Sequence, residues 1–222
     1  MSSQVFSIQP EYPILGQRFT AADAVHLDLS VDSPMLRGVD LADQDQLAES
    51  IHTAIRQGGG RIGYGGYLEE RGIYRASPHF QDGQADRSLH LGVDLWADAG
   101  HPIHAPVDGV VHSLAMNEQP LDYGATIILS HTRGDLTWYT LYGHLAAADL
   151  HWQPGDRIPA GTPFCHIGQP HENGGWVPHL HIQLILDIGE AVGDFPGVAL
   201  PSERDHWSRL CPDPMALIQF TS

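Results

Sequence analysis

Residues 178–186 read PHLHIQLIL, and this stretch joins a histidine pair to an apolar run that is typical of a buried strand. Side chains at positions i and i+2 leave the same face of a strand, with their Cα atoms about 6–7 Å apart. The imidazoles of His179 and His181 can therefore enter one site. Because a chain with 15 histidines produces such pairs by chance, the prediction of a site depends on what accompanies this pair.

Two further motifs accompany the pair: residues 90–94 read HLGVD and residues 139–145 read YTLYGHL. On a straight strand His90 and Asp94 would lie about 13 Å apart, too far to share one metal ion, so we expect the chain to bend near Gly92. With His181 added, the set offers two imidazole nitrogens and one carboxylate. Such a set suits zinc and leaves a fourth position open for water.

The order of the three motifs resembles the lysostaphin-type (LytM-like) family of zinc metallopeptidases. Residues 105–111 and 154–163 also match hairpins of that family, so the likeness covers roughly residues 85 to 187. The resemblance implies that one zinc ion per chain is held by the ligands His90, Asp94 and His181. It further implies that His144 and His179 are catalytic histidines beside the water. The sequence leaves open which of these two is the general base.

The chemistry of such a site is hydrolysis. Zinc lowers the pKa of a bound water towards 7 and polarises a carbonyl group, while a neutral imidazole can take up or give back a proton. We therefore expect a zinc-dependent hydrolase of peptide or amide bonds, of the metalloendopeptidase type. Two alternatives stay open: a metal-free binding or regulatory module of the same fold, and a phosphocarrier-like module in which a histidine carries phosphate. The phosphocarrier-like module does not explain the pairing of His90 with Asp94.

The sequence also departs from the family pattern. Residues 168–178 form a longer loop than usual, and its Glu172 and Trp176 are candidate substrate contacts. Gln183 replaces a glutamate that is common two residues past the histidine pair, and Ala125 stands where an asparagine is common. These differences put the usual cell-wall specificity in doubt. The expected substrate is a peptide or a small amide, with a peptidoglycan peptide as one option.

The flanking segments carry a second resemblance. Residues 67–74, 172–176 and 193–198 are similar to LytM-like modules of multidomain proteins that also contain a kinase-like domain and a class III aminotransferase. Those partner domains act on small amines. This resemblance implies a small amide or short peptide as substrate.

Composition limits the partners. The formal net charge is −16, with 11 Lys and Arg against 27 Asp and Glu, which argues against binding of nucleic acid and of anionic cell walls. No run of 18 apolar residues predicts a membrane span.

The first ten residues lack the basic and apolar regions of a signal peptide, so the expected location is cytoplasmic. Cys165 and Cys211 are either free thiols or one bridge.

The pattern of short apolar runs cut by Gly, Pro and Asp predicts an all-β domain over residues 85–188, an antiparallel β-sandwich or open barrel of the duplicated hybrid motif type. Residues 1–84 are expected to form an N-terminal extension, and residues 189–222 a C-terminal tail that packs on the domain and closes with a helix at 215–218. The predicted strands of the domain are 109–113, 126–130, 136–141, 163–167 and 181–186.

The N-terminal extension should contain one amphipathic helix from Asp43 to Gln57, because apolar residues recur there at helical spacing and three glycines follow. After the helix, residues 64–75 predict a strand pair or an extended arm. Arg71 and Arg75 in this arm are expected to have structural roles.

Overall fold

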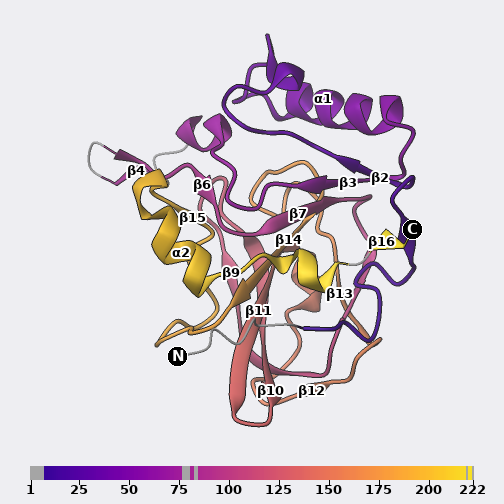
Figure 1. Cartoon of the computed structure of the whole chain (residues 1–222), viewed down its shortest axis with the longest axis vertical. Helices are drawn as coiled ribbons and strands as arrows, with labels where there is room; N and C mark the ends of the chain where they lie inside the picture. Colours follow the sequence, from indigo (N-terminus) through magenta and orange to yellow (C-terminus); the bar gives the residue numbers. More distant parts are fainter. Residues whose placement is uncertain (1–7, 77–80, 83–84, 219, 222) are drawn as a thin grey trace.

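The computed structural model describes residues 8–76, 81–82, 85–218 and 220–221. Its main element is an eight-stranded mixed sheet with the strand order β12-β9-β10-β11-β14-β7-β3-β2 (Figure 1). Neighbouring strands of the sheet are antiparallel, except for the parallel pair β2 and β3. In chain order these strands are β2 (Ala24–His26), β3 (Ile62–Gly65), β7 (Val93–Trp96), β9 (Gly109–Asn117), β10 (Gly124–Arg133), β11 (Leu136–Leu145), β12 (Arg157–Ile158) and β14 (Leu180–Ile185).

Among the described residues, four short strand pairs accompany the large sheet. They are β1 (Phe19–Thr20) with β16 (Phe220–Thr221), β4 (Gln81–Asp82) with β5 (Ala85–Asp86), β6 (Leu89–His90) with β15 (Val198–Ala199), and β8 (Pro102–His104) with β13 (Pro163–His166). The sheet is open, because β12 and β2 end it on opposite sides. The prediction of a mostly β fold is confirmed, and each predicted strand is present, three of them several residues longer than expected.

The register of three neighbouring strands brings the motifs together. His181 in β14 lies opposite Gly143 in β11 on one side and opposite Asp94 in β7 on the other. His144 follows Gly143 directly. The three motifs, which lie as much as 91 residues apart in the sequence, are therefore neighbours within one sheet.

Helix α1 (Gln44–Gln57) covers the β2–β3 side of the sheet (Figure 1). Its N-cap is Asp43, whose carboxylate accepts hydrogen bonds from the backbone N–H groups of Asp45 and Gln46, and the helix ends at Gly58. Leu47 and Ile51 lie one turn apart, so both face inward, where they pack in a cluster with Trp96. The predicted helix from Asp43 to Gln57 is confirmed, with Asp43 as its cap.

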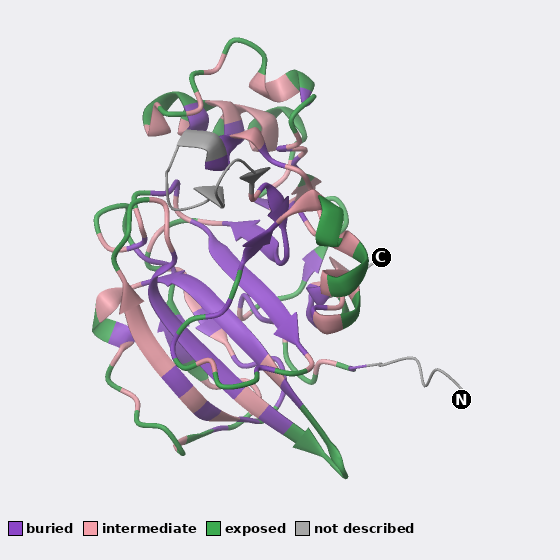
Figure 2. Cartoon of the chain, turned by 90° about the vertical axis from the view of Figure 1, so that its left-hand side faces the viewer, coloured by how far each residue is buried: buried purple, intermediate pink, exposed green. Residues whose placement is uncertain are grey.

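The core lies along the central strands (Figure 2). One buried apolar cluster includes side chains from three of these strands. They are Ile127 and Leu129 in β10, Tyr142 in β11 and Ile182 in β14, and all four are fully buried. The far end of the β10–β11 hairpin is exposed and leaves the body of the molecule. Since fully burying an aliphatic side chain contributes about 1.5–3 kcal/mol, these strands anchor the site next to them.

The two ends of the chain differ in part from the prediction. Residues 64–75, expected to form a strand pair or an extended arm, instead begin with the last two residues of β3 in the main sheet, continue with an isolated bridge from Glu70 to Leu89, and end in a 3-10 turn. The tail contains a helix α2 (Arg204–Leu210) that the sequence pattern did not indicate. The expected closing helix is a 3-10 turn, η6 (Pro214–Leu217). The other 3-10 turns in the described part of the chain are η1 (Pro34–Leu36), η2 (Gly72–Ala76), η4 (Ala147–Asp149) and η5 (Pro201–Glu203).

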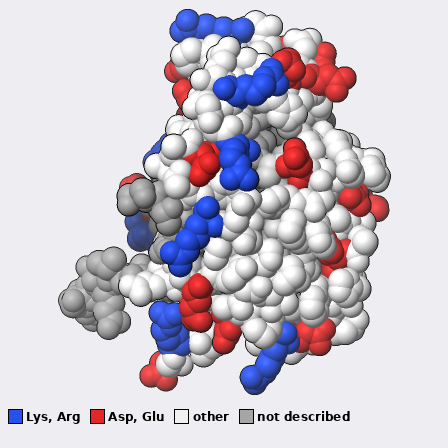
Figure 3. Space-filling model, turned by 90° about the vertical axis from the view of Figure 1, so that its right-hand side faces the viewer, with Lys and Arg blue, Asp and Glu red and all other residues white. Residues whose placement is uncertain are grey.

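Cys165 and Cys211 are buried free thiols, so the two are not bridged. None of the helices in the described part of the chain has the length and apolar character needed to cross a bilayer. On the face drawn in Figure 3, acidic and basic side chains are interspersed among uncharged ones.

Candidate metal centre and catalytic site

The chain bends between His90 and Asp94, as their separation along the sequence requires. β6 ends at His90, and β7 begins at Val93 after a break at Leu91 and Gly92. A Cβ atom on Gly92 would lie 2.5 Å from the imidazole of His181, so only glycine leaves room for that ring. The bend brings Nε2 of His90 to 3.4 Å from Oδ1 of Asp94.

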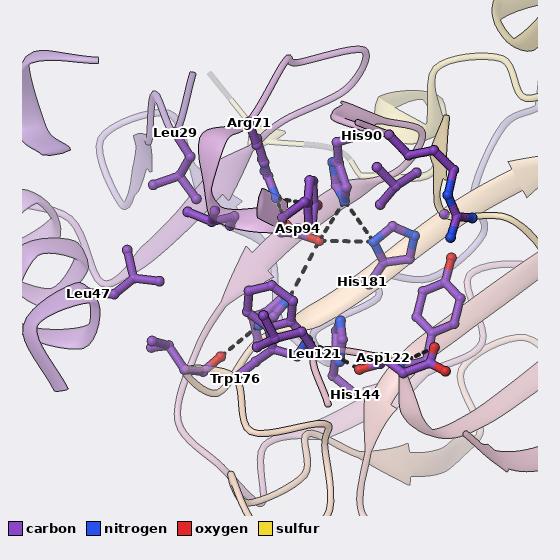
Figure 4. Close-up of a pocket in the computed structure, with 18 of the residues that line it drawn as sticks. Leu29, Leu47, Arg71, His90, Asp94, Leu121, Asp122, His144, Trp176 and His181 are labelled. Atoms are coloured by element: carbon purple, nitrogen blue, oxygen red, sulfur yellow. Dashed lines mark hydrogen bonds and ion pairs between the residues drawn. The ribbon is translucent and has the colours of Figure 1, made fainter. Parts of the chain in front are cut away.

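Three predicted ligands converge at this bend (Figure 4). Nδ1 of His181 lies 2.9 Å from Nε2 of His90 and 3.1 Å from Oδ1 of Asp94. All three residues are at most 2% exposed. One ligand atom from each residue therefore lies in a small buried volume.

The hydrogen bonds behind the histidines fix which nitrogen carries the proton. Nδ1–H of His90 donates to the carbonyl oxygen of Gly66 at 2.9 Å, and Nε2–H of His181 donates to Oε1 of Gln183 at 3.2 Å. The Gln183 amide has this orientation because its Nε2 donates to the carbonyl oxygen of Pro196 at 3.0 Å. The other nitrogen of each ring therefore presents a lone pair.

Three acceptor atoms thus face one another: two imidazole lone pairs and one carboxylate oxygen. No donor hydrogen lies between them when the histidines are neutral, and a cation is what satisfies such a set. Two nitrogens and one oxygen, each oriented by a second hydrogen bond, are a donor set that zinc prefers. The residues present therefore fit a zinc ion.

Arg71 is a residue of this site whose importance the sequence did not reveal. Its Nη1 donates to Oδ2 of Asp94 at 2.6 Å and its Nε donates to Oε2 of Glu69 at 2.7 Å, and the side chain is 2% exposed. Oδ2 of Asp94 is thereby occupied and Oδ1 is turned towards the histidines. Arg71 thus has a structural role, as expected, because it orients Asp94, a predicted metal ligand. The side chain of Arg75 lies outside the described residues.

The remaining two histidines stand beside the ligands. Nδ1–H of His144 donates to the carbonyl oxygen of Asn173 at 2.9 Å, and Nδ1–H of His179 donates to that of Val177 at 2.7 Å. Each ring therefore keeps an Nε2 lone pair that can accept a proton. The ring centroids are 4.3 Å apart, and Nε2 of His179 lies 3.7 Å from Oδ1 of Asp94.

Burial sets the charge state of the site. It lowers the pKa of His90 to about 4, and it lowers the pKa values of His144 and His179 as well. Burial opposes ionisation of Asp94, but the facing His90 and Arg71 hold the pKa of this carboxyl well below its usual range. At neutral pH the site therefore combines neutral imidazoles of His90, His144 and His179 with one carboxylate.

His144 has an unusual backbone. Its φ of 63° is in the left-handed region, which a histidine adopts only where its surroundings hold it. The backbone N–H of His144 donates to the carbonyl oxygen of Tyr123 at 2.8 Å, and its carbonyl oxygen accepts from Gly168 at 2.8 Å. These bonds keep the ring over the site.

Two aromatic residues complete the surroundings. Tyr123, which the sequence analysis did not select, has its ring centroid 5.1 Å from that of His181 and 5.8 Å from that of His144. Trp176 is 6% exposed, its ring centroid lies 6.0 Å from that of His144, and its Nε1 donates to the carbonyl oxygen of Asp122 at 3.2 Å. Trp176 therefore stands at the site, as the hypothesis of a substrate contact requires.

Glu172, the other candidate contact, lies elsewhere. Its carboxylate accepts hydrogen bonds from the backbone N–H groups of Ala147 at 2.9 Å and Gln169 at 3.0 Å, and it does not line the cavity at the site. The structure therefore gives Glu172 the role of holding the loop 168–178 against η4, which replaces the expected role of a substrate contact.

The site opens into a cavity of about 150 Å³. Its lining combines the four histidines and Asp94 with apolar side chains from α1 and from the segment before it. The other lining residues are Leu29, Leu47, Ile51, Arg71, Ile73, Tyr74, Arg87, Trp96, Leu121, Asp122, Tyr123, Trp176, Val177 and residues 194–198.

Comparison with known proteins agrees with these features. Residues 88–192 match peptidase family M23, and the matched segment contains the three predicted ligands and both further histidines. The DD-carboxypeptidase/endopeptidase Mpg of Neisseria meningitidis serogroup B and that of Neisseria gonorrhoeae are each 31% identical to this chain over 114 residues. The aligned segment is 51% of this chain, and it spans only 24% of the length of either relative.

Two solved structures illustrate the structural likeness. LytU is 25% identical, with a TM-score of 0.39 and coverage of 63% of this chain and 85% of the other. The catalytic domain of the antimicrobial peptidase lysostaphin from Staphylococcus simulans is 22% identical, with a TM-score of 0.34 and coverage of 56% and 84%.

Proposed function

Because residues 88–192 match peptidase family M23, we propose that this chain is a zinc-dependent hydrolase of peptide or small amide bonds. The observation that carries the proposal is the convergence of three buried potential ligand atoms, on His90, Asp94 and His181, within 4.8 Å of one another. When bound there, zinc would supply a Lewis acid for the carbonyl group and a water that ionises near neutral pH.

His179 is assigned as the proton acceptor. Its Nδ1–H is held by the Val177 carbonyl group, so its Nε2 is free to take a proton from a water in the cavity. The imidazolium that forms would lie 3.7 Å from Oδ1 of Asp94, whose negative charge stabilises it. The stacked indole of Trp96 fixes the plane of the His179 ring.

His144 is assigned to the leaving group. Its ring centroid lies 4.3 Å from that of His179, so the proton that His179 takes from the water can pass to His144 through a bridging water, which restores neutral His179. The Asn173 carbonyl group holds Nδ1–H of His144, so this ring also offers Nε2 to the cavity. Once protonated, Nε2 of His144 can donate to the departing amine or to an oxygen that gains charge.

Arg71 and Gln183 orient the ligands. Arg71 holds one oxygen of Asp94 and leaves the other for the metal, while Gln183 fixes the proton of His181 on Nε2. Partners of this kind commonly change metal affinity or activity by about 10–100-fold when they are removed. Gln183 is neutral where the family commonly has a glutamate, so it orients His181 without adding negative charge.

The substrate that we propose is a short peptide or small amide, with weak action on intact peptidoglycan. Two features support this: the cavity of about 150 Å³, and the wall that residues outside the M23 segment add to it. The curated relatives are named for cleaving peptides at the carboxyl end and internally, which agrees with a peptide bond as the target.

The experiment compares purified, zinc-loaded protein on short peptides, N-acyl amino acids and peptidoglycan sacs. Asp94→Asn serves as the blank, and Asp98→Asn, at an exposed position four residues on, is the matched control. We expect hydrolysis of small substrates that chelation abolishes, that zinc restores, and that Asp98→Asn retains. Hydrolysis that persists in Asp94→Asn would contradict the proposed site, and efficient lysis of sacs would contradict the proposed substrate.

A further inference from the structure

The cavity at the site has two ends of different chemistry, and the proposed reaction uses only one of them. The polar end is formed by Asp94 and the four histidines. The apolar end is formed by side chains that are each at most 5% exposed, namely Leu29, Leu47, Ile51, Trp96 and Val177. We call this second end the apolar end of the cavity.

Trp96 joins the two ends. Its indole belongs to the same buried cluster as Leu47 and Ile51, and it also stacks on His179 with 5.6 Å between ring centroids and 24° between planes. A group in the apolar end would therefore lie one ring away from the proposed proton acceptor. In Figure 4 Leu29 and Leu47 face Asp94 and His181 from the opposite side of the cavity.

The apolar end is closed at its far side. Leu29, Leu47 and Ile51 are each at most 2% exposed, because α1 and the segment before it cover them from solvent. The exposed lining residues, Asp194 and Pro196, belong instead to the loop between β14 and β15. A ligand that enters past this loop must therefore end in the apolar wall and cannot continue through it.

We propose that the apolar end is a subsite for one terminal apolar substituent of a small amide substrate, such as an aliphatic group of a few carbons or a single ring. The proposal rests on the proposed hydrolase function for its chemistry and adds the substrate class. The two ends of the cavity together have a volume of about 150 Å³, which is about the size that holds one benzene molecule, so the apolar end admits a substituent no larger than this. A closed pocket favours a terminal substituent over an internal unit of a crosslinked polymer. Each buried methylene should strengthen binding about four-fold.

The wall also supplies a matched pair of positions for a test. Leu27 and Leu29 are both 1% exposed and belong to the same buried cluster, but only Leu29 lines the cavity. Leu29→Ala and Leu27→Ala remove the same atoms from the same core. A difference in ligand preference between them therefore reports on the cavity and not on the stability of the fold.

The first experiment uses toluene as the probe and needs no catalysis. Binding to the full chain is measured by thermal shift and by NMR of the Trp96 indole, with zinc and with chelator. We expect toluene to bind wild type and Leu27→Ala alike, and Ile51→Phe, which fills the apolar end, to weaken binding at least ten-fold. Failure of wild type to bind toluene, or equal weakening in Leu27→Ala and Ile51→Phe, would overturn the subsite.

The second experiment uses N-acylglycines with acyl groups from acetyl to hexanoyl, together with benzoyl. In wild type kcat/KM should rise about four-fold per methylene until the apolar end is full. Leu29→Ala should move this optimum to a longer chain, and Leu27→Ala should not. A flat profile in an active enzyme would overturn the subsite alone, whereas toluene binding without any Asp94-dependent hydrolysis would overturn the proposed function alone.

Discussion

Metal binding should appear as a large gain in thermal stability, because the proposed ligand set exists only in the folded chain. In the metal-free protein, the acceptor atoms of His90, Asp94 and His181 face one another at 2.9–3.4 Å. A zinc ion between them replaces this repulsion with coordination bonds. The perturbation is therefore the addition or removal of zinc.

The size of the effect follows from linkage. A ligand at about 1,000 times its dissociation constant stabilises the folded state by roughly 4 kcal/mol. For a chain of this length each kcal/mol shifts the Tm by roughly 2–4 °C, so we expect a rise of roughly 8–16 °C. Differential scanning calorimetry of the same preparation with zinc and with chelator measures this rise.

The Asp94→Asn variant shows whether the rise in Tm comes from zinc at this site or from zinc bound elsewhere on the protein. This change removes the one carboxylate ligand and leaves the buried Arg71 with Glu69 as its remaining ion-pair partner. The variant should lose the zinc response and should also melt below wild type in chelator, since breaking a buried pair costs about 3–5 kcal/mol. Asp98→Asn should behave as wild type does. A zinc-induced rise that survives in Asp94→Asn would refute the reasoning.

Three further results are expected. His144→Asn, which tolerates the left-handed backbone, and His179→Ala should both retain zinc in elemental analysis but lose about 10²–10⁴-fold in kcat; loss of metal from His179→Ala would make it a ligand. Gly92→Ala should abolish zinc binding because its methyl group meets the ligand ring opposite, while Gly72→Ala, which makes only an ordinary contact, should bind zinc normally in the same titration. Folding lowers the pKa of His90 to about 4 in the metal-free protein. As the pH falls, His90 therefore takes up a proton in the unfolded chain before it does so in the folded chain. The stability contributed by neutral His90, roughly 3 kcal/mol, should therefore be present above pH 6.5 and be lost between about pH 6.5 and 4; urea unfolding that is independent of pH in this range would contradict it.

Local patterns in the sequence predicted much of the site. The bend at Gly92 follows from the distance between His90 and Asp94 along a strand, and the meeting of the motifs follows from their resemblance to one family, which residues 88–192 match. The helix from Asp43 to Gln57 was also predictable, because its cap, its apolar spacing and its terminal glycine are all local signals. Features that depend on local spacing could thus be predicted.

Features that depend on long-range packing could not be predicted from the sequence. Arg71 stands beside Glu69 and Glu70, and such a cluster is typical of a solvated surface; it becomes buried only because β3 pairs with β7. The apolar end of the cavity likewise needs α1 to pack against Trp96, a residue almost fifty positions further along the chain. Glu172 was expected to be a substrate contact, whereas its carboxylate accepts hydrogen bonds from two backbone N–H groups, one of them 25 residues away in the sequence.

Elemental analysis of the purified chain after zinc loading and dialysis shows whether His90, Asp94 and His181 together hold one zinc ion. We expect about one zinc per chain in wild type and in His144→Asn, and none in His90→Ala, Asp94→Asn or His181→Ala. Wild-type protein that takes up no zinc, or a ligand variant that keeps a full equivalent, would contradict this expectation.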